Sequence, residues 1–377
     1  MEKQKNIPSL RFPEYSGDWE TNDLGDIFKI SAGGDIGIEN VSQIKTDKYK
    51  YPIYANAEKR KGLYGFSDIY KIEENVITVA GRGVNIGIAH ARDHKFYPIV
   101  RLLVLRPKNN QNIYFFEYQI NRLDLFKEST GVPQLTAPQV SGYVVKYPSL
   151  NEQAKIASFL TKVDEKLTAL KKKKELLEQY KRGVMQQIFS QELRFKDYNG
   201  NDYPDWVTNT LGEIAEIKKG KQLNKEELTQ EGEYLCINGG ISPSGYTDKF
   251  NTLENTITIS EGGNSCGYVN FFTCKFWSGG HNYSLEIKNN EINNNDFIFQ
   301  VLKQNQSEIM KLRVGSGLPN IQKKDLSAFE LVVPNDIEEQ SKIADFLSTI
   351  DNKISYCQSQ IEKAEVWKKG LLQQMFC

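Results

Sequence analysis

Two stretches of the chain repeat apolar residues at alternating spacings of three and four, the pattern of a long helix that packs against another helix. The first stretch runs from Ile156 to Ile188, and the second runs from Ile343 to Met375. Each pattern lasts for about five heptads, as in a coiled coil. The sequence therefore predicts two long helices, over residues 149–192 and 336–377. Their expected seam residues are Ile156, Leu160, Val163, Leu167, Leu170, Leu177, Ile343, Leu347, Ile350, Ile354, Ile361 and Leu371.

The two seams most simply bury each other within one chain. The connector between them, residues 193–335, is long enough to return the chain in either direction. The first helix has a basic face at residues 171–174, 181 and 182, whereas the second helix is net acidic. Pairing of the seams between two chains is the alternative.

The regions of about 20–148 and 207–335 contain short β-branched and aromatic runs separated by Gly, Asn and Pro, which predicts strands and turns. A strand that runs into a glycine loop, Ile77–Gly87, recurs further along the chain as Ile257–Gly267. The contents of the two loops differ, since Arg82 in the first corresponds to Gly262 in the second. This is the pattern expected of two readers that share a frame and read different things.

The whole chain is duplicated at an almost constant offset in residue number. The segment Gln153–Lys166 returns as Gln340–Lys353, and Asp18-Trp19 returns at the same offset as Asp205-Trp206. Two such periods account for nearly the whole chain of 377 residues. A repeat of this length indicates two copies of a whole module, and therefore pseudo-twofold symmetry and a target with two halves.

A short segment, Leu10-Arg11-Phe12, recurs as Leu193-Arg194-Phe195 directly after the first predicted helix. The amino-terminal segment thus has the sequence of a segment that follows a helix. We expect it to lie where the second helix ends.

Net charge is zero over the chain, but residues 1–196 carry +8 and residues 197–377 carry −8. This asymmetry favours contact between the halves, and a neutral total neither supports nor excludes DNA. The odd number of cysteines and the absence of a CxxC pair argue against a disulfide framework or zinc site. No stretch resembles a secretory signal or a membrane span, so the sequence predicts a cytoplasmic protein.

Catalytic machinery is not repeated in the two copies. Asp205 followed by Glu216 and Lys218 fits the loose pattern of a magnesium nuclease, but Glu216 and Lys218 correspond to Lys29 and Ser31 in the other copy. Cofactor and phosphate loops are missing, as is the tetrapeptide of base methylases. The three histidines, His90, His94 and His281, show no metal-ligand spacing shared by both copies. The sequence therefore predicts a protein that binds rather than reacts, with no resident metal.

The order of these motifs resembles the specificity subunit of type I restriction–modification enzymes. The resemblance rests on Leu-Arg-Phe with a nearby Trp and Leu-Gly, on Thr130–Leu135 and Gly315–Ile321, on the Lys-Ile-Ala-x-Phe-Leu and Asp-x-Lys segments, and on the closing Gly-x-x-Gln-Gln-x-Phe. It covers essentially the whole chain, twice over.

The resemblance implies an α+β fold in which two duplicated mixed α/β target-recognition domains are separated by two long helices that form an antiparallel coiled coil. The first domain would span 1–148, with an amino-terminal segment 1–19, and the second 193–335, with the helices over 149–192 and 336–377. Each domain would read one half of a bipartite asymmetric site on double-stranded DNA, and the helices would set the spacer.

The subunit would have no catalysis of its own and no cofactor. It would recruit two methyltransferase subunits, which use S-adenosylmethionine, and restriction subunits, which use ATP and Mg²⁺. The alternative is a coiled-coil scaffold with two β-rich modules that bind peptides or glycans.

Polar and basic loop residues supply the donors and acceptors that distinguish base edges in the major groove. The candidates in the first domain are Lys61, Tyr64, Arg82, Asn85, Thr130 and Gln134. Those in the second domain are Asn238, Asn264, His281, Asn282, Arg313, Ser316 and Asn320. For any one of them, a turn residue that binds its own backbone is the alternative.

Overall fold

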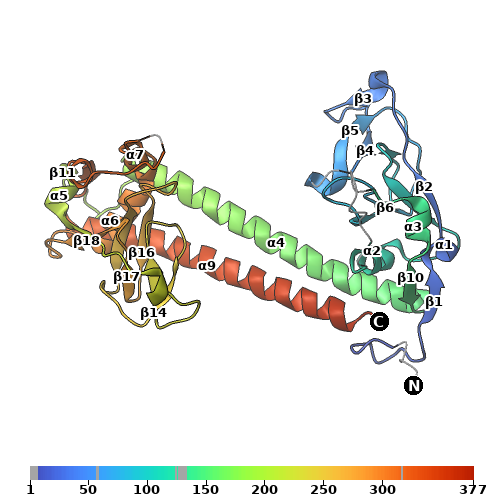
Figure 1. Ribbon diagram of the computed structural model, residues 1–377. Coiled ribbons are helices and arrows are strands. Elements are labelled where there is room, and N and C mark those ends of the chain that lie inside the picture. The colour runs from blue at the N-terminus through green and yellow to red at the C-terminus, as the bar shows by residue number, and fades with distance from the viewer. Residues whose placement is uncertain (1–6, 57–58, 124, 126–133, 316) are drawn as a thin grey trace. The chain divides into compact units, whose positions relative to one another are not determined.

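The computed structural model describes residues 7–56, 59–123, 125, 134–315 and 317–377, and the chain forms two compact units (Figure 1). The first unit comprises Met1–Lys171 and Ser359–Cys377, and the second comprises Lys172–Gln358. Each unit therefore contains one mixed α/β domain and one part of each long helix. The two modules predicted from the sequence repeat are present.

The first unit contains ten strands and the start of the first long helix within the residues described. Its chain order is β1 Glu20–Asp23, α1 Leu24–Ile27, β2 Phe28–Ala32, β3 Val41–Ser42, β4 Tyr51–Tyr54, β5 Leu63–Ser67, β6 Val76–Val79, β7 Ala89–Arg92, β8 Tyr97–Pro98, β9 Leu103–Pro107, α2 Ile113–Asn121, α3 Ala137–Ser141, β10 Val144–Tyr147 and α4 Leu150–Phe189. Two 3₁₀ turns, Ile38–Asn40 and Lys59–Gly62, lie among the strands.

The second unit has a similar order of elements, without a counterpart of β3 and with an additional helix. Its elements are β11 Val207–Thr210, α5 Leu211–Ile214, β12 Ala215–Lys219, a 3₁₀ turn at Lys225–Glu227, β13 Tyr234–Ile237, β14 Gly245–Thr247, β15 Thr256–Ser260, β16 Val269–Phe272, β17 Phe276–Ser278, β18 Asn282–Ile287, α6 Asn295–Gln304, α7 Gln306–Lys311, α8 Lys323–Ser327, β19 Glu330–Val333 and α9 Ile337–Gln374. The additional helix is α7. The unit also contains the end of α4, and α9 continues from it into the first unit.

The main sheets of the two domains have the same strand order. The order β2-β9-β6-β7 in the first domain corresponds to β12-β18-β15-β16 in the second. Ile77 pairs with Leu105, and Ile257 pairs with Leu285, so the register is preserved between the two copies. Strand β6 is buried at all four positions, because its apolar run is covered on both faces. The duplicated strand and glycine loop thus build the same frame twice.

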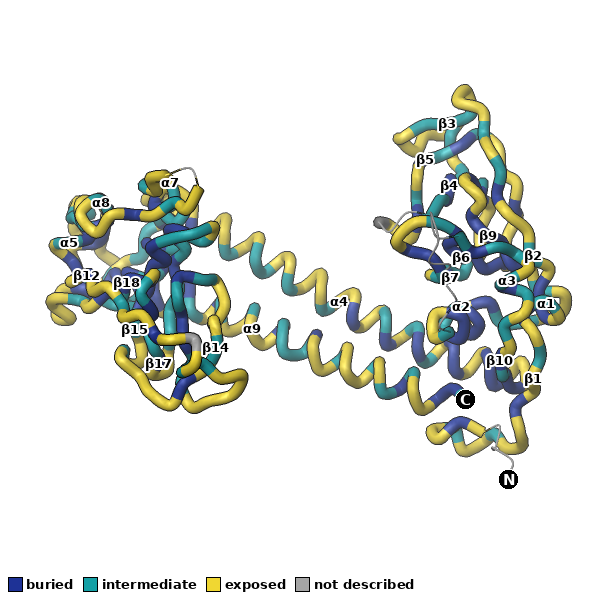
Figure 2. Tube along the Cα trace, in the orientation of Figure 1, coloured by how far each residue is buried: buried dark blue, intermediate teal, exposed yellow. Residues whose placement is uncertain are grey.

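The two predicted helices are present as α4, of 40 residues, and α9, of 38 residues. Nine of the twelve predicted seam residues are buried; Leu170, Leu177 and Ile354 are half-buried, because a two-helix seam covers them from one side only. Figure 2 shows these positions recurring along both helices among exposed ones. No helix of the described residues is long and apolar enough to cross a membrane.

The helices run antiparallel. In the first unit, the start of α4 shares a core with the end of α9, where Leu160 lies with Leu371. In the second unit, the end of α4 shares a core with the start of α9, where Ile188 lies with Leu347. The intramolecular pairing of the seams is therefore confirmed.

The amino-terminal segment lies at the end of α9. The Leu10 amide donates to the Gln374 carbonyl at 2.9 Å, and the Ser9 hydroxyl donates to the same oxygen at 3.2 Å. The expectation from the repeated Leu-Arg-Phe is confirmed. These bonds satisfy a carbonyl in the last turn of the helix, where no intrahelical donor remains.

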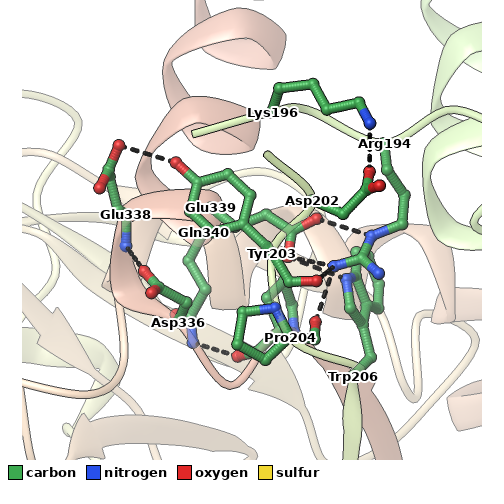
Figure 3. A network of polar contacts seen from close by, with 11 residues as sticks. Arg194, Lys196, Asp202, Tyr203, Pro204, Trp206, Asp336, Glu338, Glu339 and Gln340 are labelled. Carbon is green, nitrogen blue, oxygen red and sulfur yellow. Dashed lines mark hydrogen bonds and ion pairs between the residues drawn. The ribbon is translucent and has the colours of Figure 1, made fainter. Parts of the chain in front are cut away.

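A buried carboxylate at the start of each long helix binds the Leu-Arg-Phe arginine. Arg194 donates through Nε and Nη2 to Glu339 at 3.1 and 2.9 Å, and to the carbonyl of Pro204 at 2.7 Å (Figure 3). Arg11 binds Glu152 in the same bidentate way, at 2.8 and 2.7 Å. Hydrogen bonding to the carboxylate raises the pKa of each arginine. Because both glutamates are buried, each needs such a partner.

Candidate nucleic-acid interface

Four segments of the first domain meet at the glycine loop that follows β6. The Asn56 side chain accepts from the Gly81 amide at 2.9 Å and donates to the Val100 carbonyl at 2.7 Å. The Leu135 amide donates to the Gly81 carbonyl at 2.9 Å. Residues after β4, after β6 and after β8 are thereby joined to the segment before α3.

The second domain joins the corresponding segments in the same way. The Asn238 side chain accepts from the His281 amide at 3.1 Å, and the Glu261 amide donates to the His281 carbonyl at 2.9 Å. The Ile321 amide donates to the Glu261 carbonyl at 2.9 Å, as Leu135 does to Gly81. The ends of β13, β15 and β17 therefore meet the segment before α8 at one place on the domain.

The shape of both loops depends on glycine. Gly83 and Gly87 have φ values of 80° and 89°, and Gly263 and Gly267 have 75° and 86°, in the left-handed region that other residues rarely adopt. A Cβ at Gly267 would also lie 2.8 Å from the Cα of Met310. The frame therefore fixes the path of the loop and leaves the other loop positions free to vary.

Two candidates of the first domain bind each other. Arg82 donates through Nη2 to the Gln134 side-chain oxygen at 2.9 Å, and their backbones form a β-bridge. This pair joins the glycine loop to the segment before α3, and the other N–H groups of the guanidinium can donate to a ligand. Thr130, the neighbouring candidate, lies outside the described residues.

The remaining candidates of the first domain have different positions. Lys61 is exposed, and Tyr64 is exposed on β5. Asn85 is 9% exposed and its carbonyl accepts from the Ile88 amide, whereas the neighbouring Val84 is 90% exposed. The turn is therefore closed by the backbone of Asn85, and a DNA contact by its side chain stays a prediction.

In the second domain, four candidates are exposed around the glycine loop: Asn264, His281, Arg313 and Asn320. Asn320 forms a β-bridge with Gly262, as Gln134 does with Arg82. Ser316 lies outside the described residues.

Two asparagines of the second domain have structural roles. Asn282 is 1% exposed and donates to the Ser278 hydroxyl at 3.0 Å, so its predicted contact with DNA is corrected to an internal hydrogen bond. Asn238 is half-buried and its side-chain oxygen accepts from the amide of His281, so it joins two segments that lie far apart in the sequence.

Sequence reasoning missed two residues at these meeting points. Arg92 is 3% exposed, lies 3.6 Å over the Tyr54 ring, and donates to the Thr78 hydroxyl and to the Lys61 carbonyl. Its burial lowers its pKa. The second residue, Glu261, stands where the first domain has Gly81, and this difference between the two copies was visible in the sequence.

The nuclease pattern has a simpler explanation. Glu216 lies directly opposite Glu286 on the pair β12–β18, and Lys218 forms ion pairs with both carboxylates. These groups are exposed, and a bridging lysine relieves the repulsion between facing acids.

Comparison with known proteins identifies the frame. The family model described as "Type I restriction modification DNA specificity domain" matches residues 16–179 and 203–366, so it matches the chain twice. The chain belongs to this family. The resemblance stated from the sequence motifs is confirmed.

Several relatives carry the same description. A putative type I specificity subunit of Mycoplasma genitalium is 37% identical over 162 residues, and one of Mycoplasma pneumoniae is 36% identical over 162 residues. Those matches cover 43% of this chain and 42% and 43% of the relatives, so the matched part spans less than half of their length. The putative MjaX specificity subunit of Methanocaldococcus jannaschii is 26% identical over 98% of this chain and 95% of its own.

A solved structure shares the fold. The crystal structure of the S subunit of a type I restriction–modification system from Mycoplasma genitalium superposes with a TM-score of 0.76, covering 98% of this chain and 99% of that one. The sequence identity is 21%, so the similarity concerns the fold. The predicted arrangement of two domains and two antiparallel helices is confirmed.

Proposed function

We propose that this chain is the DNA-specificity subunit of a type I restriction–modification complex, in which each domain reads one half of a split site on double-stranded DNA. The observation that carries the proposal is the duplicated frame with different loop contents. The same four segments meet in both domains, yet the loop carries Arg82 paired with Gln134 in one and Glu261 beside His281 in the other. A shared frame with different polar groups reads two different sequences.

The chemistry of the two meeting points fits the edges of base pairs. Arginine reads guanine through two donors, and glutamine and asparagine read adenine through one donor and one acceptor. Arg82, Gln134, His281, Arg313 and Asn320 are the candidates that we retain for base contacts. Lys61 is retained for a phosphate contact, since an exposed ammonium supplies charge without sequence discrimination.

In this proposal the chain binds and positions the DNA, and other subunits carry out the chemical reactions. Two methyltransferase subunits that use S-adenosylmethionine, and restriction subunits that use ATP and Mg²⁺, act on the DNA held by this chain in the cytoplasm. The pairing of α4 with α9 in both units supports a role for the helices in setting the spacer between the half-sites.

The test is methylation mapping. The chain is produced with its methyltransferase partners, supplied with S-adenosylmethionine and genomic DNA, and the methylated positions are sequenced. We expect one asymmetric motif made of two short half-sites separated by a fixed number of unread base pairs. Methylation without sequence preference, or no DNA binding by the complex, would instead favour the scaffold with two ligand-binding modules.

A further inference from the structure

The glycine loop of the second domain carries a carboxylate at a position where the first domain has a glycine. A Cβ at Gly81 would lie 3.1 Å from the backbone oxygens of Arg101 and Leu135, so a side chain there would be tightly packed. The equivalent residue of the second domain is Glu261, whose side chain is only 10% exposed. A charge buried at one of two equivalent positions indicates a role specific to that domain.

The two oxygens of Glu261 have different surroundings. Oε1 accepts from the Lys219 ammonium at 2.7 Å and from the Tyr283 hydroxyl at 3.1 Å. Burial, together with the nearby Glu261 charge, raises the pKa of Tyr283, so the phenol remains a donor. Oε2 is buried and has no hydrogen-bond partner among the residues described. An unsatisfied buried acceptor is unfavourable, so a hydrogen bond donated to Oε2 would stabilise the domain.

The imidazole of His281 lies beside this oxygen. Its Nδ1 lies 4.0 Å from Oε2, and its side chain is 65% exposed. The backbone of His281 is fixed on both sides, by Asn238 and by the amide of Glu261. Residue 262 is glycine, and no side chain there blocks the ring. A small rotation of an exposed ring therefore brings Nδ1–H onto Oε2.

We propose that Glu261 positions His281 as a base-reading residue of the second domain, with Oε2 accepting Nδ1–H and Nε2–H directed at a guanine edge in the major groove. This inference rests on the proposed DNA-recognition function. In the imidazolium form of histidine both ring nitrogens are donors. Guanine N7 and O6 are acceptors in the major groove.

The other ionisable groups around this pair are accounted for. Lys219 and Tyr283 occupy Oε1, and the buried Cys266 thiol donates to the Glu261 carbonyl at 3.0 Å. Burial raises the pKa of the Cys266 thiol, and the charge of Arg313 has a smaller, opposite effect on it. Oε2 is left to His281.

The experiment uses the complex with the methyltransferase subunits and a duplex bearing the mapped site. The imidazolium is favoured at lower pH, so affinity should fall as pH rises. We expect wild type to bind about tenfold more tightly near pH 6 than near pH 8, since histidine changes charge in this interval. In His281→Gln this pH dependence should be lost, and in Glu261→Gln it should change, because a neutral amide replaces the carboxylate beside the ring. Both should also relax the preference at one base pair of the second half-site by about tenfold, as one base contact does.

The matched control is Tyr283→Phe, which removes a partner of Oε1 and leaves Oε2 and His281 in place. It should keep both the pH profile and the base preference, and thermal melting will confirm that each variant is folded. An unchanged pH profile and preference in Glu261→Gln would overturn the assignment, as would an equal loss of affinity for all sequences in His281→Gln, which marks a phosphate contact. A wild-type complex without any sequence preference would overturn the proposed function itself.

Discussion

The Lys181 ammonium lies 2.7 Å from both carboxylate oxygens of Asp351, and this ion pair joins α4 to α9 within the second unit. The first unit contains its repeat, since Lys368 lies 2.5 Å from Asp164. In the duplicated sequence, Lys368 corresponds to Lys181, and Asp351 corresponds to Asp164. Each helix therefore supplies the lysine of one ion pair and the aspartate of the other.

Each aspartate also binds its own domain. The Tyr118 hydroxyl, on α2, donates to Asp164 at 2.7 Å, and the Gln300 amide, on α6, donates to Asp351 at 3.0 Å. In each unit, one aspartate of a long helix thus binds both the recognition domain and the other long helix.

The reciprocal pair makes one half of the chain self-complementary. Residues 1–196 contain both Asp164 and Lys181, so we predict that this fragment forms a homodimer, as a twofold assembly with a twofold interface does. The homodimer should recognise a palindrome of the first half-site. Sedimentation gives the mass, and methylation mapping gives the site.

A charge-reversal series checks the contact in that fragment. Lys181→Asp should weaken the homodimer, because each partly exposed pair contributes about 1 kcal/mol and the replacement adds repulsion. Lys181→Asp combined with Asp164→Lys should restore it. A monomeric fragment, or a dimer that still methylates the asymmetric site, argues against the reciprocal arrangement.

A charge should disrupt the seam more at a buried position than at a half-buried one. Leu167→Asp places a charge at a position that is 7% exposed and should cost several kcal/mol. Ile354→Asp should cost less, because Ile354 is half-buried. Affinity for the split site should collapse while the recognition domains remain folded, as measured by DNA binding beside thermal melting. Unchanged melting and binding in both variants would show that the seam does not hold the assembly together.

Arg82 should act on the first half-site alone. If its guanidinium contacts a guanine edge, Arg82→Ala should relax preference at one or two base pairs there and cost about 1–3 kcal/mol. Gln134→Ala should affect the same base pairs, because Gln134 orients Arg82. Methylation sequencing reads both half-sites at once, so the second serves as the internal control. A uniform loss across sequences would mark Arg82 as a phosphate contact.

Exchange of the first recognition domain extends this test. Replacing residues 20–148 with the equivalent segment of a relative should change one half of the mapped site and leave the other unchanged.

Removing the arginine partner of the buried glutamate should destabilise the two copies to different extents. Removing one partner of a buried ion pair costs about 3–5 kcal/mol. Glu339 also accepts from the Trp206 indole at 3.2 Å, whereas the equivalent Trp19 indole has no partner among the residues described. Arg11→Ala should therefore destabilise the chain more than Arg194→Ala does. Chemical denaturation of the two variants gives the comparison, and a larger loss in Arg194→Ala would contradict it.

The helices should act as a ruler. Inserting a four-residue helical turn between Thr168 and Glu175 adds about 6 Å of helix, close to two base pairs at about 3.4 Å each. Four residues also return the helix to nearly the same face, and coiled coils absorb such a stutter by local unwinding. The spacer should lengthen by one or two base pairs with both half-sites unchanged. Methylation sequencing of the variant decides, and an unchanged spacer would mean that the helices only hold the parts together.

The seam could be predicted because a heptad pattern reports which side of a helix is buried. Lys181 and Lys368 interrupt the apolar pattern, yet both lie at the interface, since each finds an aspartate on the other helix. The duplication likewise predicted that the amino-terminal segment lies at the end of α9, where the Leu10 amide donates to the Gln374 carbonyl, because equivalent segments occupy equivalent places.

The direction of loop side chains could not be predicted. Asn282 and His281 are neighbours with similar polarity, yet one is 1% exposed and the other points into solvent. The outcome depends on Ser278 and Asn238, which the fold brings to this turn. Arg82 and Gln134 lie far apart in the sequence and meet only because Leu135 pairs with Gly81. Such long-range contacts leave no local pattern in the sequence.

The division of the chain into units also fixes an order of completion during synthesis. The second unit is one continuous segment, 172–358, whereas the first unit needs residues 359–377 as well. Phe376 is 3% exposed and its ring stacks on that of Phe115, with the ring centroids 5.2 Å apart, so residues made after the second unit complete the core of the domain made first. Although domains commonly fold in the order in which they are made, here the unit encoded second has all of its residues first. Until residues 359–377 are made, the first domain presents an open apolar face that the end of α9 later covers.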